Sequence, residues 1–392
     1  MQVENKTNCT GCGACYNICP IGAIIMQNDK YGFYKPVIDK NKCTNCGLCE
    51  KICPLDNYKS KNNEPRAFAL TNKNEEVLTK CTSGGAFNAI AKFIFEQNGF
   101  VYGVIWDKNI VAVFYRAENI EQLEKMYSSK YVQANTLGTF KQAKKDLENG
   151  RLVLYSGTPC QIAGLKSYLK KDYENLFTVD LICHGTPSPL VFEKYKKEFL
   201  KKKPNEKIIN INFRSKINGW GTIQFINIKT NLKEYIQSCN KDDYSKAFGF
   251  HASVNSMCSN CQFNKIPRIA DITIGDFWGV DEYDKSLNDK KGLSIVLINN
   301  EKGQNLLHEI EGICKLQEVP LDVATKRNPN IYSSSKAHKN REKFLEYVCI
   351  KNKPLKSGVQ KYLKTPIHII IYRLLPKFAK NFIKYKIIKM EK

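Results

Sequence analysis

Hydrophobic and polar positions recur along the chain at spacings typical first of helices and then of strands. Residues 84–96 place apolar side chains at helical intervals, which predicts a helix. Residues 100–106 and 110–115 are apolar runs on either side of a short polar turn, which predicts a β-hairpin. This part of the chain is therefore expected to mix helices and strands.

Two consecutive strand–loop–helix units follow. Residues 151–155 are a short apolar run, a Ser-Gly-Thr-Pro loop comes next, and a helical pattern extends to about residue 170. Residues 176–182 begin a second unit, whose helix is expected at 191–201. Such units predict neighbouring parallel strands. The same patterns predict strands at 208–213, 222–229, 269–274 and 293–298 and helices at 139–148, 303–310 and 336–348, in a domain that ends near residue 350.

The first part of the chain contains a repeat of cysteines. The set Cys9, Cys12, Cys15 and Cys19 recurs 34 residues later as Cys43, Cys46, Cys49 and Cys53, and a proline follows each set. This C-x2-C-x2-C-x3-C-P run is the bacterial ferredoxin pattern. We therefore expect one 4Fe-4S cluster on Cys9, Cys12, Cys15 and Cys53 and a second on Cys43, Cys46, Cys49 and Cys19. The alternative is structural zinc, which is typical of two separated CxxC pairs rather than of two complete runs.

The composition is that of an ordinary folded protein with an unusual number of thiols. The 392 residues are 42% hydrophobic and 25% charged, so wholesale disorder is excluded, and 16 are cysteines. We find no signal peptide and no apolar run of 18 residues, so we expect a reducing, cytoplasmic location. The predicted fold class is α+β: a small ferredoxin-like dicluster domain at residues 1–58, a polar linker at 55–66, and a larger α/β domain with a mixed, partly parallel sheet at 66–350.

Four further cysteines form a candidate third site. Cys160 and Cys183 each lie just past the carboxyl end of a predicted strand, and these ends share one edge of a parallel sheet. Together with the Cys258-x2-Cys261 pair they have the number of thiolates that one 4Fe-4S cluster needs. Alternatives remain open: CxxC also suits half a zinc site or a redox pair, Cys160 and Cys183 can be buried apolar residues, and Cys160 can be a nucleophile with His184 as its base. The remaining cysteines, Cys81, Cys239, Cys314 and Cys349, show no ligand spacing and are expected to be structural.

At these positions the chain resembles the coenzyme F420 hydrogenase/dehydrogenase beta subunit family, with a two-cluster ferredoxin domain fused in front. The resemblance implies an FAD enzyme that moves a hydride to or from a deazaflavin, with one 4Fe-4S cluster in the flavin domain. It also implies that Ser83, Gly84, Gly85, Ser129, Lys130, Tyr131, Gln133, Thr158 and His184 border the flavin or substrate. The matching segments are residues 83–87, 129–133, 157–161, 180–185 and 270–279 and the Cys258-x2-Cys261 pair.

Some of these residues have a physical interpretation without the resemblance. Ser83-Gly84-Gly85 precedes a helix, whose amides attract phosphate, although such a pair of glycines is often only a turn. Lys130 can neutralise a phosphate or lie on the solvated surface, and His184 can move a proton or pack in the core. Lys130 and His184 are the candidate catalytic residues. Asp271 and Asp276 flank a strand, where capping roles are expected before catalytic ones.

The positive charge is concentrated near the C-terminus. The formal net charge is +23, and residues 351–392 contain twelve Lys or Arg and one acid. From residue 371 an apolar stripe and a basic stripe recur at helical spacing, which suits an anionic membrane surface at the inner face. The alternative is a terminal helix packed on its own domain. A nucleic-acid partner is not expected, because no recognition fold accompanies the charge.

The leading hypothesis is a flavin-dependent iron–sulfur oxidoreductase. Electrons would pass between a hydride carrier at FAD and three 4Fe-4S clusters to a redox partner protein. One alternative is an iron–sulfur subunit that transfers electrons without hydride chemistry. Another is a reductase of a metabolite in a biosynthetic, polysaccharide-type pathway.

Overall fold

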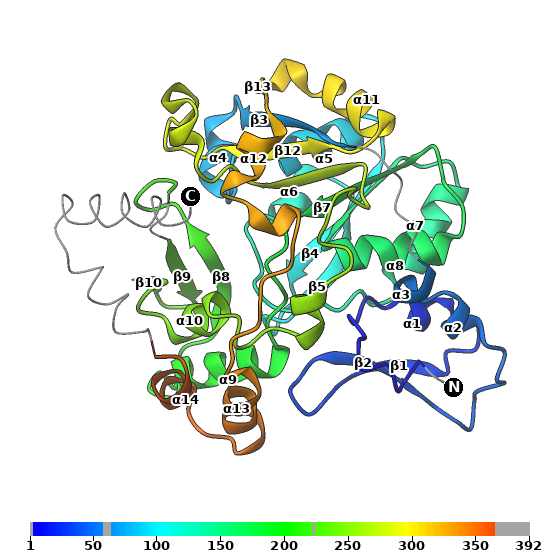
Figure 1. Ribbon diagram of the computed structural model, residues 1–392, viewed down its shortest axis with the longest axis vertical. Helices are drawn as coiled ribbons and strands as arrows, with labels where there is room; N and C mark the ends of the chain where they lie inside the picture. The colour runs from blue at the N-terminus through cyan, green and yellow to red at the C-terminus, as the bar shows by residue number, and fades with distance from the viewer. Residues whose placement is uncertain (1–2, 58–63, 222–223, 365–392) are drawn as a thin grey trace, which may run out of the picture.

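The structure is a computed structural model that describes residues 3–57, 64–221 and 224–364. A large mixed sheet forms the centre of the molecule, and the ferredoxin-like domain and a small second sheet lie below it on opposite sides (Figure 1). Among the described residues, no helix has both the length and the apolar character needed to cross a bilayer.

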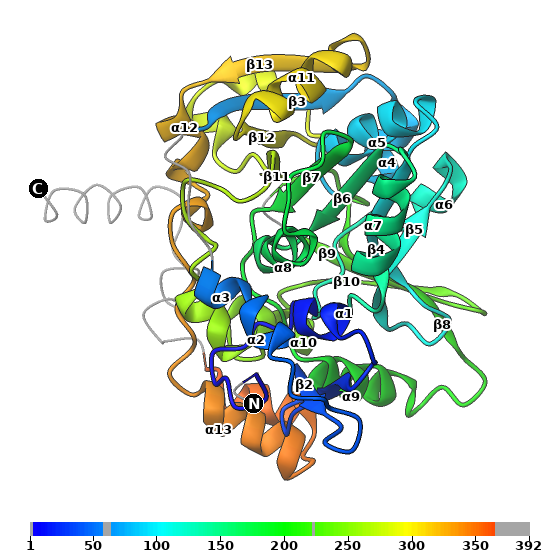
Figure 2. The ribbon, with the colours of Figure 1, turned by 90° about the vertical axis from the view of Figure 1, so that its right-hand side faces the viewer.

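The ferredoxin-like domain consists of one hairpin and three short helices. In the hairpin, Ile24 pairs with Ile38 and Asn28 pairs with Tyr34 in antiparallel register. The helices lie on the side of this hairpin that faces the larger domain (Figures 1 and 2), and the turn of the hairpin contacts that domain directly, because the Ser188 hydroxyl donates to the Tyr31 carbonyl. The elements are α1 (Ala14–Ile18), β1 (Ile24–Asn28), β2 (Tyr34–Ile38), α2 (Leu48–Lys51) and α3 (Pro54–Asn57).

The main sheet has eight strands and is parallel only at its centre. The strand order is β13-β3-β12-β11-β7-β6-β4-β5. The four central strands, β11, β7, β6 and β4, all run parallel to one another. Each strand outside this group pairs with its neighbours in antiparallel register. The mixed, partly parallel sheet predicted from sequence is therefore confirmed. The strands are β3 (Arg66–Asn72), β4 (Phe100–Trp106), β5 (Ala112–Ala117), β6 (Val153–Gly157), β7 (Leu176–Leu181), β11 (Ile272–Asp276), β12 (Ser294–Ile298) and β13 (Cys314–Val319).

Helices cover both faces of this sheet because its central strands are apolar on both sides. In β6, for example, Leu154 belongs to the core on one face of the sheet and Tyr155 to the core on the other face, and both are fully buried. One face is covered by α5 (Ala86–Glu96), α6 (Ile120–Glu124) and α11 (Glu301–Glu309). The other is covered by α7 (Thr139–Glu148), α8 (Pro159–Leu169) and α12 (Leu321–Lys326). The short helix α4 (Glu75–Lys80) follows β3.

A three-stranded antiparallel sheet forms a separate layer next to the main sheet. The sequence pattern predicts two of its strands but not that they leave the main sheet. Phe213 and Ile228 of this layer pack into the same core as α9 and α10. The elements are β8 (Ile208–Ser215), β9 (Phe225–Thr230), β10 (Glu234–Ser238), α9 (Pro189–Leu200) and α10 (Asp243–Gly249).

The larger domain continues past the boundary predicted at residue 350. After α13 (Arg341–Leu345) and the π-helical turn Glu346–Ile350, the chain forms α14 (Leu355–Tyr362). Leu355, Val359 and Leu363 are buried in the main core because α14 packs against α9, α10 and α13. The amphipathic stripe predicted from residue 371 lies outside the described residues.

Candidate functional site

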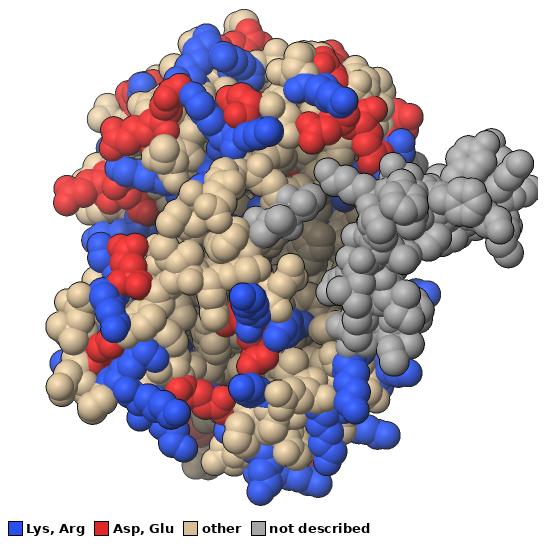
Figure 3. Space-filling view, turned by 90° about the vertical axis from the view of Figure 1, so that its left-hand side faces the viewer, with Lys and Arg blue, Asp and Glu red and all other residues tan. Residues whose placement is uncertain are grey.

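A cavity of about 520 Å³ lies beyond the carboxyl ends of the parallel strands. Its walls come from strands of the main sheet, the loop before α5, the loop at 126–132 and the small sheet. In open α/β sheets ligands gather at this edge, and the volume is that of a small-molecule or cofactor site. Figure 3 shows a hollow on one face of the molecule, with uncharged residues around much of its rim.

Most residues predicted to border a flavin line this cavity. The set that does so is Ser83, Gly85, Ser129, Lys130, Tyr131, Thr158 and His184. They come from four segments of the chain, so only the fold brings them to one space.

Gly84 and Gln133, which were also predicted to border a flavin, are not among the residues that line the cavity. Gly84 packs against the sheet: its amide donates to the Ser294 hydroxyl at 2.9 Å, and a Cβ there would lie 2.1 Å from the Leu70 carbonyl oxygen. The Gln133 side chain donates to the Thr10 carbonyl at 3.0 Å and accepts from the Tyr34 amide at 2.9 Å. Gln133 therefore fastens the ferredoxin-like domain rather than a cofactor.

The loop before α5 leaves helix amides free toward the cavity. Gly85 is the N-cap, has φ of 80°, and caps the helix with no side-chain hydrogen bond. The Lys216 ammonium holds this loop from below by donating to the carbonyls of Ser83 at 2.7 Å and Leu78 at 2.8 Å. Burial lowers the pKa of Lys216 to about 8. The arrangement suits an anionic group at the helix N-terminus, as predicted for the Ser-Gly-Gly segment.

Lys130 is held by its own loop. Its ammonium donates to the carbonyls of Tyr127 at 2.7 Å, Lys125 at 3.0 Å and Ser128 at 3.2 Å. Burial lowers its pKa to about 7. These contacts position the loop that brings Ser129 to the cavity, and a direct catalytic role for Lys130 stays a prediction.

The small sheet adds a polar and aromatic wall that the sequence did not identify. The Arg214 guanidinium donates to Asp276 at 2.8 Å and to the Tyr131 hydroxyl at 3.1 Å. Asp276 also accepts from the Trp220 indole at 3.0 Å, and Trp220 stacks on Trp278 with ring centroids 5.1 Å apart. Asp276 is thus the last residue of β11 and holds the cavity wall in place. No sequence pattern around Arg214 indicated that β8 would reach this wall.

His184 lies on the wall of the large cavity, and its pKa is below the usual value. Burial lowers its pKa, and the nearby His251 and Arg214 lower it further while Asp276 opposes them. His184 lines the large cavity, whereas Cys160 lines a second one, so the two side chains face different spaces. This geometry does not favour the Cys160–His184 nucleophile considered above.

The four inner cysteines line one small cavity. Cys160 begins α8, Cys183 follows β7, and the short 3-10 turn Ser256–Asn260 supplies Cys258 and leads to Cys261. Burial raises the pKa of all four thiols. The Gly185 and Thr186 amides each donate to a cysteine sulfur at 3.4 Å, a pattern that would stabilise metal-bound thiolates. The donor set therefore fits a 4Fe-4S cluster.

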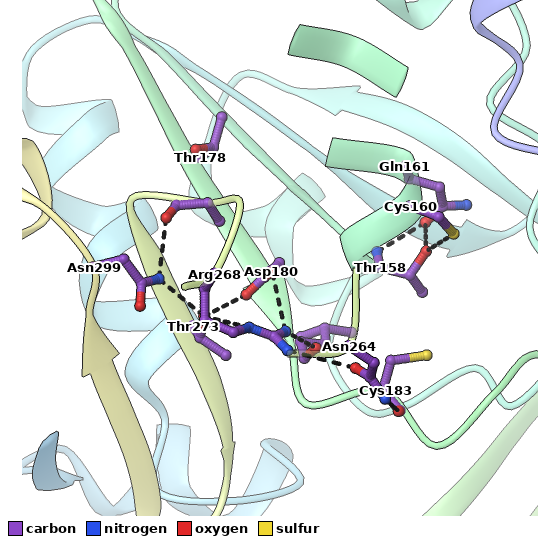
Figure 4. A network of polar contacts seen from close by, with 12 residues as sticks. Thr158, Cys160, Gln161, Thr178, Asp180, Cys183, Asn264, Arg268, Thr273 and Asn299 are labelled. Atoms are coloured by element: carbon purple, nitrogen blue, oxygen red, sulfur yellow. Dashed lines mark hydrogen bonds and ion pairs between the residues drawn. The ribbon is translucent and has the colours of Figure 1, made fainter. Parts of the chain in front are cut away.

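A buried ion pair holds the Cys183 loop in place (Figure 4). The Arg268 guanidinium donates to Asp180 at 3.0 Å, and both side chains are fully buried. Arg268 also donates to the Leu181 carbonyl at 3.1 Å. Asn264 donates to the Cys183 carbonyl at 2.8 Å. The nearby Asp271 has a similar structural role, since it accepts from the Thr178 amide at 2.7 Å.

One of the two predicted sets of N-terminal cysteines lines a single cavity, and Cys15 of that set also lies in the small core with Cys19 and Cys49 of the other set. Cys9, Cys12, Cys15 and Cys53 line a third cavity. Of the other set, Cys19 and Cys49 pack together in the small core, Cys43 lies at its edge, and Cys46 is exposed. Among the described residues, no three His, Cys, Asp or Glu side chains meet as tightly as one metal ion requires.

The three cavities adjoin one another. Cys183, Gly185 and Thr186 line both the large cavity and the four-cysteine cavity. Thr10 lines both the four-cysteine cavity and the one with Cys9. The helices α1 and α8 approach closely here, because a Cβ on Gly164 would lie 3.0 Å from the Cys12 sulfur.

The other cysteines show no such grouping. Cys81 and Cys239 line the large cavity singly, and burial raises the pKa of Cys81 to about 11. Cys314 is buried in the core, and Cys349 lies against the Tyr31 carbonyl at 3.8 Å.

Comparisons with known proteins match two parts of the chain. The family model for the C terminus of the beta subunit of coenzyme F420 hydrogenase/dehydrogenase matches residues 150–322, and the model for the 4Fe-4S dicluster domain matches residues 8–57. The search of curated proteins gives no match. Among solved structures, a chain of the F420-reducing NiFe hydrogenase complex from Methanosarcina barkeri is similar, with 16% identity and a TM-score of 0.47 over 79% of this chain and 100% of that one. The chain therefore combines an N-terminal 4Fe-4S dicluster domain with a region, residues 150–322, that is similar to the C terminus of the coenzyme F420 hydrogenase/dehydrogenase beta subunit.

Proposed function

We propose that the protein is a flavin-dependent iron–sulfur oxidoreductase. FAD would occupy the large cavity, and a third 4Fe-4S cluster would be held by Cys160, Cys183, Cys258 and Cys261. Electrons would pass between a deazaflavin-type hydride carrier at the flavin and a redox partner protein at the dicluster domain.

The observation that carries this proposal is the succession of cavities. The four-cysteine cavity shares one wall with the large cavity and shares Thr10 with the cavity of Cys9, Cys12, Cys15 and Cys53. A hydride carries two electrons and a 4Fe-4S cluster accepts one, and a bound flavin supplies the chemistry that divides them. The inner cysteines lie where such a relay would need its first cluster.

The chain's own residues would bind and orient the cofactor. The open amides before α5 would take its phosphates, helped by the nearby Lys216. Arg214 stays fixed by Asp276 and lies 5.2 Å from the Trp278 ring centre, so this wall keeps its shape and excludes water from one side of the cavity. His184, neutral near pH 7, would accept or donate a proton at an imidazole nitrogen facing the cavity.

Anaerobic reconstitution with iron, sulfide and flavin tests the proposal. Three clusters require about twelve iron atoms per chain. The variant Cys183→Ala should retain about eight, because the dicluster domain does not use Cys183. Cys314→Ala is the matched control, since Cys314 is a buried thiol outside these cavities and should leave the iron content unchanged.

Two outcomes would contradict the proposal. About eight iron atoms in the unmodified protein would reject the inner cluster. Clusters without bound flavin would instead support an electron-transfer subunit without hydride chemistry. With flavin bound, trials of deazaflavin and of nicotinamide carriers as anaerobic reductants identify the hydride carrier.

A further inference from the structure

We propose that one face of the β1–β2 hairpin docks a small, acidic, one-electron carrier protein. This face, called the hairpin face below, consists of the cross-strand pair Ile25 and Val37, with Ile21 shortly before β1 and Lys40 and Lys42 shortly after β2. The inference rests on the proposed function, because it names the partner of the outer end of the same electron path.

The hairpin face is apolar and exposed. Ile21 and Ile25 are each 46% exposed and Val37 is 36% exposed. Ile25 and Val37 are direct cross-strand partners, so their side chains lie together on one face of the hairpin. Adjacent exposed apolar side chains on a small domain are typical of a protein interface.

The hairpin face lies next to the second predicted cluster set of the dicluster domain, Cys19, Cys43, Cys46 and Cys49. Cys19, two residues before Ile21, is one predicted ligand of that set. At the same open end of the hairpin, where β2 ends, the Cys43 amide donates to the carbonyl of Asp39 at 3.0 Å, and Asp39 lies two residues after Val37. Cys46 of the same set is exposed.

The other cysteine set of the dicluster domain, Cys9, Cys12, Cys15 and Cys53, lies on the side of the larger domain. Cys12 packs against α8 of the larger domain, and Gln262 of that domain donates to the Leu55 carbonyl at 3.2 Å. Figures 1 and 2 show α1 and α3 between the hairpin and α8. An outside electron carrier therefore reaches the dicluster domain on its hairpin side.

The charge around this face favours an acidic carrier. Lys40 and Lys42 are exposed where β2 ends, and Asp39, 3.3 Å from the Lys42 ammonium, offsets one of these two charges. Electron-transfer complexes commonly have small interfaces, and complementary charge at their rim raises the association rate.

Stopped-flow reduction of the reconstituted full chain tests the docking surface. The probe is a reduced, acidic two-cluster bacterial ferredoxin, and sodium dithionite is the small-molecule comparison. Ile25→Glu/Val37→Glu and Lys40→Glu/Lys42→Glu should each slow reduction of the chain's clusters by the ferredoxin by ~10-fold or more at low salt. Reduction by dithionite should not change.

Matched controls place the same changes elsewhere. Ile209→Glu/Ile217→Glu changes two residues of the small-sheet region that are 51% and 56% exposed, and Lys197→Glu/Lys229→Glu reverses two exposed lysines. Both should react with the ferredoxin at the unmodified rate. Equal slowing by the control pairs, no slowing by the hairpin pairs, or equal loss of dithionite reduction would overturn the proposal. Because the readout is bleaching of the iron–sulfur absorbance, it does not depend on bound flavin, so failure of flavin reduction alone would count against the proposed function and not against this surface.

Discussion

The two groups of cysteines in this protein are assembled in different ways. The N-terminal eight lie within 45 residues of one another, and two repeated loops bring them together. The inner four come from three segments, and Cys160 and Cys261 are about a hundred residues apart. They meet because β6 and β7 are adjacent parallel strands, paired at Gly157 and Asp180, whose carboxyl ends share one edge. A site of the first kind depends on local turns, and a site of the second kind depends on the buried interactions of the whole domain.

The largest effect that separates the two sites should come from the buried ion pair behind Cys183. Arg268→Met leaves the Asp180 carboxylate buried without its partner, which costs on the order of 3–5 kcal/mol. Urea unfolding should show this loss, and the iron content should fall toward that of the dicluster domain alone.

Two further variants control this experiment. Arg66→Met removes the exposed pair with Glu318 and should change the unfolding free energy little. Asp180→Asn/Arg268→Met removes both buried charges and should recover part of the lost stability. If Arg268→Met alone is as stable as the unmodified protein, the inner site does not depend on this pair.

A smaller effect should distinguish the two cysteine repeats from each other. Gly13 and Gly47 occupy equivalent positions and have φ of 80° and 71°. Alanine in this left-handed conformation costs about 1–2 kcal/mol at either position. At Gly13 the new Cβ would also lie 2.0 Å from the Thr136 hydroxyl of the larger domain, whereas at Gly47 nothing lies within 4 Å.

Gly13→Ala should therefore destabilise the folded chain by about 1–3 kcal/mol more than Gly47→Ala, as overpacking typically does. Thermal unfolding of the two variants measures the difference. Adding Thr136→Ala to Gly13→Ala should reduce it, because the hydroxyl is the nearest obstacle. Equal destabilisation by both glycine variants would show that contact with the larger domain does not distinguish the repeats.

A pH dependence of stability is expected in the larger domain. The pKa of Lys130 is lowered from 10.5 to about 7 by burial, so the unfolded chain binds more protons than the folded one between these values. The contribution of Lys130 to the free energy of unfolding therefore increases as the pH rises from about 7 to about 10.5. Below about pH 7 this contribution does not change with pH.

The unfolding free energy of the unmodified protein relative to Lys130→Met should accordingly increase between pH 7 and pH 10. Lys197→Met, at an exposed lysine, is the control and should show no such trend. A flat difference for Lys130→Met would mean that the three carbonyl acceptors hold the ammonium charged over this range.

The periodicity of the chain was sufficient to predict most helices and strands near the site. The helix expected at 84–96 is α5 (Ala86–Glu96), and the hairpin, α7, α8 and α9 lie close to their predicted ranges. These elements could be predicted because each has an apolar face that repeats at its own period. Strands β13 and β10 were not predicted, because short strands with exposed positions carry little periodic signal.

The amino-acid order by itself determined the two repeated cysteine runs and the strand ends at which Cys160 and Cys183 lie, because both are local properties of the chain. Tertiary structure alone decided which side chains meet at the cavities. It brought Arg214 of β8 to the large cavity and Lys216 of the following turn to the loop before α5, and it turned Gln133 toward the ferredoxin-like domain. The physical reason is that these contacts join residues more than sixty positions apart, whose meeting depends on how the sheets and helices bury their apolar faces together.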